Sequence, residues 1–209
     1  MNTKQKILLE SLRLFSQRGY DAVSVEQIAA AVGIKAPSLY KHYKSKQDIF
    51  DAIFEETARR YEAFTDTISV HVQNSEQDVI VFEQITADDL VEKVRSLIEY
   101  SLHDEYVSRF RRMMTIEQFR SPELSALYSQ RYVNQIHDYH KGLFTKMIAA
   151  GVLADEEPGI LAMIYDAPFF VLLGECDRHP DKELECMKTL EKHVRLFYKT
   201  FNRKEKGEK

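Results

Sequence analysis

The chain has 209 residues, of which 44% are hydrophobic and 30% charged, a globular composition that excludes a disordered or fibrous protein. Glycine (7) and proline (5) are scarce, which favours long helices over the frequent turns of a β-sandwich or barrel. The net charge is −4, yet residues 1–50 hold eight basic and four acidic side chains, so they carry +4 and the remainder carries −8. Unless this clustering is chance, a basic N-terminal segment followed by an acidic remainder is typical of a nucleic-acid-binding protein.

The N-terminal residues and the two cysteines indicate the cellular compartment of the protein. The start of the chain, Met1–Gln5, is polar, and no apolar stretch approaches the roughly 18–20 residues of a membrane helix. Cys176 and Cys186 form no CxxC pair. We therefore expect a cytoplasmic protein with two free thiols, no signal peptide and no membrane association.

Four helices are predicted in the first part of the chain. Apolar residues at helical spacing indicate a helix over Thr3–Gln17. The S-x-x-Q pattern of Ser24–Gln27 predicts a capping box that opens a short second helix, ended by Gly33. A third helix should begin near Ala36, and the S-x-x-D pattern of Ser45–Asp48 should cap a longer fourth helix reaching to about residue 70.

The second and third helices have the features of a helix-turn-helix motif. Ala29 is small enough for the crossing of the two helices, and Gly33 tolerates the positive φ of the turn. The apolar anchors that should face inward are Ile28, Val32, Ile34, Leu39 and Tyr43. The side chains left facing outward are those of Lys35, Ala36, Ser38, Tyr40, Lys41 and His42. Such short and basic side chains suit base edges and phosphates in a major groove.

Further helices are predicted in the rest of the chain, except over residues 72–86, where a loop, a short strand and a helix end all remain possible. A T-x-x-D cap at Thr86–Asp89 opens one helix, and residues 104–119 form the next. The expected later helices run from Ser121 to Gly151, from Pro158 to about Cys176, and from about Asp181 to Asn202.

Residues 23–53, VSVEQIAAAVGIKAPSLYKHYKSKQDIFDAI, resemble the DNA-binding signature of the TetR family of bacterial regulators. The resemblance implies an all-α fold, in which a long fourth helix links a three-helix helix-turn-helix domain to a helical ligand-binding and dimerisation domain. We place these domains at residues 1–46 and 47–202, followed by a charged tail at 203–209. The DNA-binding residues that outward placement and the resemblance together indicate are Ser24, Lys35, Ala36, Ser38, Tyr40, Lys41, His42 and Lys46. The resemblance implies that Tyr40 and Lys46 contact phosphate and that Tyr43 anchors the core.

A ligand pocket in the second domain is indicated only by side-chain chemistry. Aromatic, methionine and polar side chains gather in residues 104–147, and they would suit a mostly apolar small molecule with one or two polar groups. The candidate lining residues are Phe110, Met113, Met114, Glu117, Tyr128, Tyr132, His140 and Phe144. Each of them could equally be an ordinary core residue. His137 and His140 lie three residues apart, which is weak evidence for a metal, and we expect none.

The last two helices are candidates for a dimer interface, because the first carries a wide apolar band and the second an apolar band at three-to-four spacing. The candidate contact residues are Ile164, Phe169, Leu172, Leu190, Val194 and Phe197. The resemblance implies a four-helix bundle between two subunits. A two-fold dimer would place its recognition helices roughly 34–36 Å apart, or a multiple of that, on a pseudo-palindromic operator.

The sequence therefore predicts a DNA-binding transcriptional regulator, a homodimer on a double-stranded operator that an unknown small-molecule effector releases. No catalytic motif is present, so we expect neither an enzyme nor a cofactor. An activator of the same family is one alternative. A helical lipid- or metabolite-binding protein without DNA function is the other, and such a protein would not need the outward basic residues.

Overall fold

The computed structural model describes residues 1–71 and 75–203, and every regular element in those ranges is helical. A single isolated bridge, between Leu153 and Asn202, is the only extended pairing that they contain. The prediction of an all-α fold is thus confirmed. The charged tail predicted at 203–209 lies outside the described residues beyond Arg203, as do residues 72–74 of the ambiguous segment.

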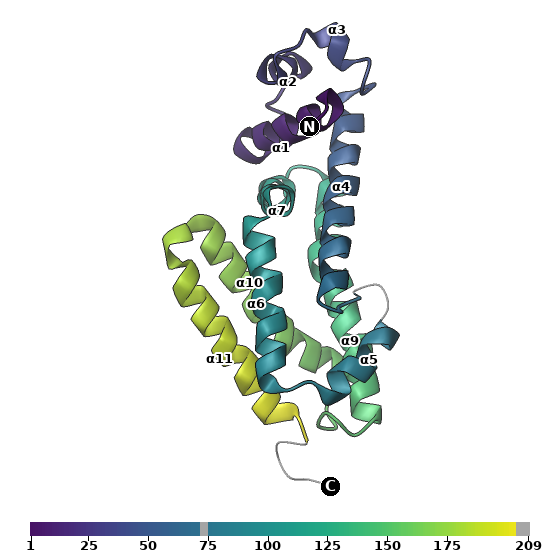
Figure 1. The fold of residues 1–209 in the computed structure, drawn as a ribbon, viewed down its shortest axis with the longest axis vertical. Coiled ribbons are helices and arrows are strands. Elements are labelled where there is room, and N and C mark those ends of the chain that lie inside the picture. The colour runs from purple at the N-terminus through teal and green to yellow at the C-terminus, as the bar shows by residue number, and fades with distance from the viewer. Residues whose placement is uncertain (72–74, 204–209) are drawn as a thin grey trace. The chain divides into compact units, whose positions relative to one another are not determined.

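The helices follow one another with short connections (Figure 1). They are α1 (Thr3–Arg18), α2 (Val25–Val32), α3 (Ala36–Leu39), α4 (Lys46–Thr67), α5 (Ser75–Gln84), α6 (Ala87–His103), α7 (Glu105–Glu117), α8 (Pro122–Tyr128), the π-helix η1 (Ser129–Asn134), α9 (Gln135–Ala149), α10 (Pro158–Arg178), the 3-10 helix η2 (Pro180–Lys182) and α11 (Glu183–Phe201). By packing, they form two compact units. The first holds Met1–Ala63 and His103–Tyr128, and the second holds Phe64–Leu102 and Ser129–Lys209. The functional boundary between residues 46 and 47 stays a prediction.

The first unit is built around α1, which packs against both α2 and α7. Ile7, Leu12 and Phe15 of α1 are fully buried. Phe110 of α7 is enclosed as well, with its ring 6.2 Å from that of Phe50 and 5.8 Å from that of Phe54 on α4. The N-terminal helices α1 and α4 therefore share their core with α7, a helix that begins only at Glu105.

The second unit has two adjoining cores. One lies where α9 and α10 meet α11 and contains Leu143, Phe144 and Tyr165. The other joins α6 to α11 through residues such as Ile98, Leu190 and Val194. In Figure 1 α10 and α11 lie side by side as an antiparallel pair. Both cysteines are buried and free, and burial, with a hydrogen bond that the Cys176 thiol donates to Cys186, raises the pKa of that thiol to about 12.

Two segments differ in detail from the sequence-based expectation. Residues 75–84 of the ambiguous segment form a helix, α5, whose Val79 and Phe82 pack on the core around α9. The long helix expected from Ser121 to Gly151 is interrupted by six residues of π-helix, Ser129–Asn134. A π-helical stretch leaves the overall course of a helix intact, so apolar periodicity does not reveal it.

The expectation that no apolar stretch approaches membrane length is wrong for α10, whose 21 residues have a mean hydropathy of 1.5 over the most apolar window. A third of that window is buried inside the chain. Asp166 lies in the middle of the helix, with its Oδ1 2.6 Å from Nδ1 of His140 on α9. A single helix of this apolar length is weak evidence for a membrane span, so α10 does not by itself indicate a membrane protein.

Candidate nucleic-acid interface

The start and end of α2 are fixed by local hydrogen bonds that the sequence predicted. The Ser24 hydroxyl accepts the Gln27 amide hydrogen bond at 3.3 Å, and the Gln27 side chain accepts the Ser24 amide at 2.9 Å. Gly33 ends the helix in the left-handed conformation, with φ +80° and ψ +31°, which favours glycine. Ala29 is buried at the crossing, as are Ile28 and Val32. The helix-turn-helix geometry therefore follows from residues of the motif itself.

α3 is short, and turns carry the chain on from Tyr40 to His42. Leu39 faces the core, whereas Lys35, Tyr40, Lys41 and His42 are exposed, with Tyr40 retaining 49% of its accessible surface. Ala36 and Ser38 are half-buried. In the part of the chain that the structure describes, no hydrogen bond or ion pair engages the side chains of Lys35, Lys41 or His42. These cationic and aromatic groups are thus available to an external anionic partner.

Other lysines of the basic N-terminal region hold the motif together. Lys6 of α1 donates to the carbonyl of Val32 at 2.8 Å, at the end of α2. Lys46 donates to the carbonyls of Tyr20 and Val23 at 3.0 and 3.2 Å, and its ammonium group lies 4.2 Å from the centre of the Tyr20 ring. The basic region therefore divides into lysines that brace the fold and lysines that face outward. A phosphate contact by Lys46 stays a prediction.

Tyr43 ends the outward segment and points inward. Its ring is 3% exposed and lies 5.3 Å from the Lys4 ammonium group. Its hydroxyl has no hydrogen-bond partner among the described residues. Burial raises the pKa of Tyr43 to about 12. The structure thus places this tyrosine in the core, as the sequence analysis expected.

The candidate pocket residues fall in different places. Phe110, Met113 and Met114 lie in the closed core of the first unit, where Glu117 hydrogen-bonds the backbone of Tyr20. Tyr128 ends α8 and Tyr132 lies in the π-helix. His140 and Phe144, both on α9, line a cavity of the second unit. The structure therefore brings two of the eight residues together at a cavity.

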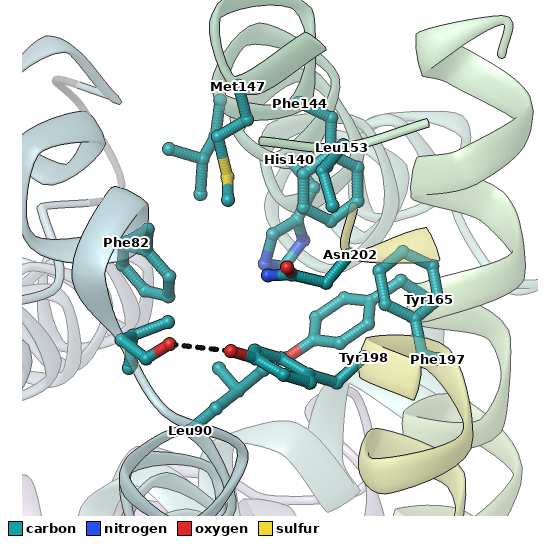
Figure 2. Close-up of a pocket in the computed structure, with 12 residues that line it drawn as sticks. Phe82, Leu90, His140, Phe144, Met147, Leu153, Tyr165, Phe197, Tyr198 and Asn202 are labelled. Carbon is teal, nitrogen blue, oxygen red and sulfur yellow. Dashed lines mark hydrogen bonds between the residues drawn. The ribbon is translucent and has the colours of Figure 1, made fainter. Parts of the chain in front are cut away.

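This cavity is apolar and small (Figure 2). Its volume is about 40 Å³, little more than one water molecule needs. Aromatic side chains from α5, α9, α10 and α11 surround it, including those of Phe82, Phe144, Tyr165 and Phe197, while His140 and Asn202 supply polar groups. The hydroxyl of Tyr198 donates to the carbonyl of Ile85 at 3.0 Å. The sequence could not single out Phe82, Tyr165 or Tyr198, because they come from separate helices.

A close contact between a histidine and a buried aspartate lies at one wall of the cavity. The Nδ1 atom of His140 is 2.6 Å from Oδ1 of Asp166, and Asp166 is 5% exposed. The other oxygen of Asp166 is 3.9 Å from Nδ1 of His137 and has no hydrogen-bond partner among the described residues. Within those residues no group of three or more metal-binding side chains comes together. His140 Nδ1 likewise has no hydrogen-bond partner among the described residues, so a polar ring atom lies buried beside the apolar cavity without a hydrogen bond of its own.

The candidate interface residues need a correction. Leu190, Val194 and Phe197 are enclosed in the chain's own cores, so they offer no surface to a second subunit. Phe169 and Leu172 are half-buried, and Ile164 is exposed. The exposed apolar side chains of α10 are Ile160, Met163, Ile164, Phe170 and Val171, which recur at helical spacing. The apolar band of α10 thus has a buried side and an exposed side, which hydropathy alone does not distinguish.

Comparison with known proteins agrees with the helix-turn-helix geometry. Residues 7–53 match the model of the family described as bacterial regulatory proteins, tetR family. The HTH-type transcriptional regulator AcrR of Shigella flexneri is 45% identical over 53 residues, 25% of this chain and 25% of AcrR. IcaR of Staphylococcus aureus, the HTH-type negative transcriptional regulator of the biofilm operon icaADBC, is 44% identical over 48 residues, 23% of this chain and 26% of IcaR. Each match thus spans about a quarter of the relative's length.

The whole chain resembles solved structures of such regulators in fold. SmeT, the repressor of the Stenotrophomonas maltophilia multidrug efflux pump SmeDEF, superimposes with a TM-score of 0.65. The alignment covers 97% of this chain and 91% of SmeT at 19% identity. At this identity the likeness shows a shared fold, an N-terminal helix-turn-helix domain followed by a helical body.

Proposed function

The chain belongs, through residues 7–53, to the TetR family of bacterial regulatory proteins, and we propose that it is a dimeric, ligand-relieved repressor of a pseudo-palindromic operator. The observation that carries the DNA-binding part is the outward set on and after α3. Lys35 and Lys41 are exposed and have no partner among the described residues, whereas Lys6 and Lys46 are held by backbone carbonyls. Unpaired lysines beside a recognition helix supply the phosphate contacts that anchor a DNA reader.

The test is a salt titration of DNA binding. The probe is a fluorescent duplex that the wild-type protein selects from a random-sequence pool, and the variant combines Lys35→Ala with Lys41→Ala. Each lost phosphate contact lowers the slope of log affinity against log salt by about 0.9, so the double variant should lose about 2. The matched control combines Lys141→Ala with Lys188→Ala, two exposed lysines of the second unit.

The outcomes separate the candidate functions. Weaker binding and a smaller slope in the Lys35–Lys41 variant, with an unchanged control, would support the proposed interface. Equal losses in both variants would assign binding to net charge alone. If the wild-type protein selects no duplex, the helical metabolite-binding alternative gains.

Dimerisation is proposed through the exposed side of α10. Met163 and Val171 retain 59% and 66% of their accessible surface, and they belong to a row of apolar side chains along one helix. A row of this kind is costly to leave in water and is characteristic of a protein interface. A two-fold axis beside α10 would pair this row with its copy, and the resulting dimer would carry two helix-turn-helix motifs.

The effector is proposed to bind in the second unit, at the cavity in front of His140. An open groove of about 640 Å³ lies next to this cavity, and Ile85, in the connection between α5 and α6, lines both. Displacement of Ile85 would join the small apolar cavity to a hollow of ligand size. The chemistry favours an apolar molecule with one group that hydrogen-bonds to His140.

Release of DNA by a ligand requires that the ligand favours one of two states. A panel of apolar phenols is the first probe set, with triclosan among them because SmeT forms a complex with it. A ligand should lower the affinity of the wild-type protein for its selected duplex. The same ligand should have no effect on an Ile85→Trp variant, whose indole would block the junction of cavity and groove. Binding that leaves DNA affinity unchanged would count against ligand relief.

A further inference from the structure

The connection between α1 and α2 makes an unusually close approach to α7. At Gly19 the backbone has φ +84°, and a side chain there would bring its Cβ within 2.5 Å of Glu117 Oε1 and 2.7 Å of Arg120 Nη1. The absence of a side chain at Gly19 therefore permits the contact. Glu117 is the last residue of α7, and Arg120 follows that helix.

A buried carboxylate accepts the next backbone amide. Glu117 is 1% exposed, and its Oε1 accepts the amide hydrogen bond of Tyr20 at 3.0 Å. The same oxygen lies 3.3 Å from Nη1 of Arg120, whose side chain is half-exposed. A carboxylate that accepts a backbone N–H forms a stronger hydrogen bond than a neutral acceptor does, and its removal would leave that N–H without a partner.

The carbonyl of Tyr20 is held from the other side. Lys46, the first residue of α4, donates to the carbonyls of Tyr20 and of Val23 at 3.0 and 3.2 Å. The Glu117 carboxylate thus accepts the N–H of Tyr20, and the Lys46 ammonium group donates to its C=O. The Tyr20 ring is held as well, by contacts with Phe15 and Phe50 at 5.1 and 5.3 Å between ring centres. We name this Glu117–Tyr20–Lys46 arrangement the loop clamp.

The loop clamp lies directly before the helix-turn-helix motif. Val23 is buried, and Ser24, the next residue, caps α2. Three residues therefore separate the clamped Tyr20 from the first residue of the motif. The direction in which α2 leaves the loop is set by the clamp, and α3 follows from α2 through the Gly33 turn.

We propose that Glu117 is a positioning residue for DNA binding, which makes α7 a working part of the DNA-binding unit although it lies far from the motif in sequence. The proposal rests on the proposed DNA-binding function. Glu117 touches no DNA itself. By holding Tyr20 it fixes the helix-turn-helix motif in one orientation, so that binding to a specific duplex does not have to order it.

The loop clamp joins two separate stretches of the first unit. α7 belongs to the first unit, and the chain passes from it to the second unit at both ends, between residues 102 and 103 and between 128 and 129. α4 passes between the units once, after Ala63. Glu117 and Lys46 therefore lie on two separate stretches of the first unit, and each stretch continues along the chain into the second unit.

The experiment compares Glu117→Ala, Glu117→Gln and a control, Glu123→Ala, which removes an exposed carboxylate six residues further along the chain. Three quantities are measured on each full-length variant. They are the affinity for a duplex that the wild-type protein selects from a random pool, the affinity for a scrambled duplex of equal length, and the melting temperature. Hydrogen exchange of the peptide spanning residues 16–24 reports on the Tyr20 amide.

Glu117→Ala should bind the selected duplex about tenfold more weakly, equivalent to about 1.4 kcal/mol. It should bind the scrambled duplex as the wild type does and exchange the Tyr20 amide faster. Glu117→Gln keeps an oxygen that accepts the Tyr20 N–H, so it should restore most of the specific affinity. Glu123→Ala should match the wild type throughout.

The results that would overturn the inference are distinct from failure of the proposed function. If the wild-type protein prefers no duplex over the scrambled one, the DNA-binding proposal itself fails. If the wild type is specific and Glu117→Ala is equally or more specific, the positioning role is refuted. Parallel losses on both duplexes that follow a lower melting temperature, without rescue by Glu117→Gln, would also refute it, because they would show a purely structural role.

Discussion

The helix-turn-helix segment and the α9–α11 region are held together by different kinds of interaction. In the first, single residues make identifiable local hydrogen bonds, such as the Ser24–Gln27 capping box, or adopt a special conformation, as Gly33 does. In the second, the aromatic side chains of α9, α10 and α11 pack around one another, for example Phe144, Tyr165 and Phe197. A capping residue or a turn glycine can be replaced by few other residues, whereas a packed core tolerates many substitutions that conserve volume.

This difference matches the distribution of similarity to known proteins. Identity reaches 44–45% in the N-terminal region and is 19% over the whole fold shared with SmeT. The segment that would touch DNA is held to one geometry by its caps and turn. The body retains its helices and is free to change the side chains around its cavity, which is where specificity for a ligand would arise.

The largest expected effect is on the core of the second unit. Leu190→Ala removes a side chain that is 1% exposed between α6 and α11, so the free energy of unfolding should fall by about 2–5 kcal/mol. Urea unfolding of the full chain measures it. Leu184→Ala, on the exposed side of the same helix, is the control and should change stability by less than about 0.5 kcal/mol. Equal losses would contradict the assignment of inner and outer faces.

The exposed row of α10 gives the next effect. Introducing two charges with Met163→Asp and Val171→Asp should raise the dimer dissociation constant at least ~100-fold, about 2.7 kcal/mol, because charge would be buried in an apolar interface. Sedimentation velocity over a concentration series measures it. Ile80→Asp, an equally exposed apolar position on α5, should leave the dimer intact. A dimer that survives the α10 substitutions would place the interface elsewhere.

A smaller effect separates two roles of Ser24. Ser24→Ala should lower the free energy of unfolding by about 1 kcal/mol, because the N3 amide loses its capping oxygen. Ser24→Asp restores a capping oxygen and adds a negative charge where phosphate is expected. It should therefore recover the stability and still weaken DNA binding, as denaturation and anisotropy would measure. If Ser24→Asp binds DNA as tightly as the wild type does, Ser24 caps α2 but makes no contact with phosphate.

The smallest effect at neutral pH concerns Tyr43. Its buried hydroxyl has no partner among the described residues, so Tyr43→Phe should change stability at pH 7 by less than about 1 kcal/mol. Burial raises the pKa of Tyr43 to about 12 in the folded state, above the value of about 10 expected for an unfolded chain. The unfolded state therefore loses this proton first, and the wild type should lose stability relative to Tyr43→Phe as pH rises from 10 to 12. Parallel pH profiles would contradict this placement.

The sequence was sufficient where one element specifies itself. The caps at Ser24 and Ser45, the Gly33 turn and the burial of Leu39 follow from patterns within a few residues, and the structure has them all. Contacts between residues far apart in the chain could not be predicted from the sequence. Glu117 and Tyr20 are 97 residues apart, and no local pattern connects them.

The partner of an apolar helix face sets a second limit. Leu190 and Val194 were expected at a dimer interface and belong to the core, since hydropathy does not tell which side packs within the chain. The cavity in front of His140 is similar, because its walls come from several helices and the sequence around Phe82 and Ile85 has no clear periodicity.

The most direct test of the account is a hydroxyl-radical footprint of the wild-type protein on its selected duplex. Two protected half-sites related by a two-fold axis, with centres one helical turn or a multiple of it apart, are the predicted result. Protection should be lost in the variant that combines Lys35→Ala with Lys41→Ala. A single protected site, or protection that persists without these two lysines, would contradict a dimer that reads DNA through α3.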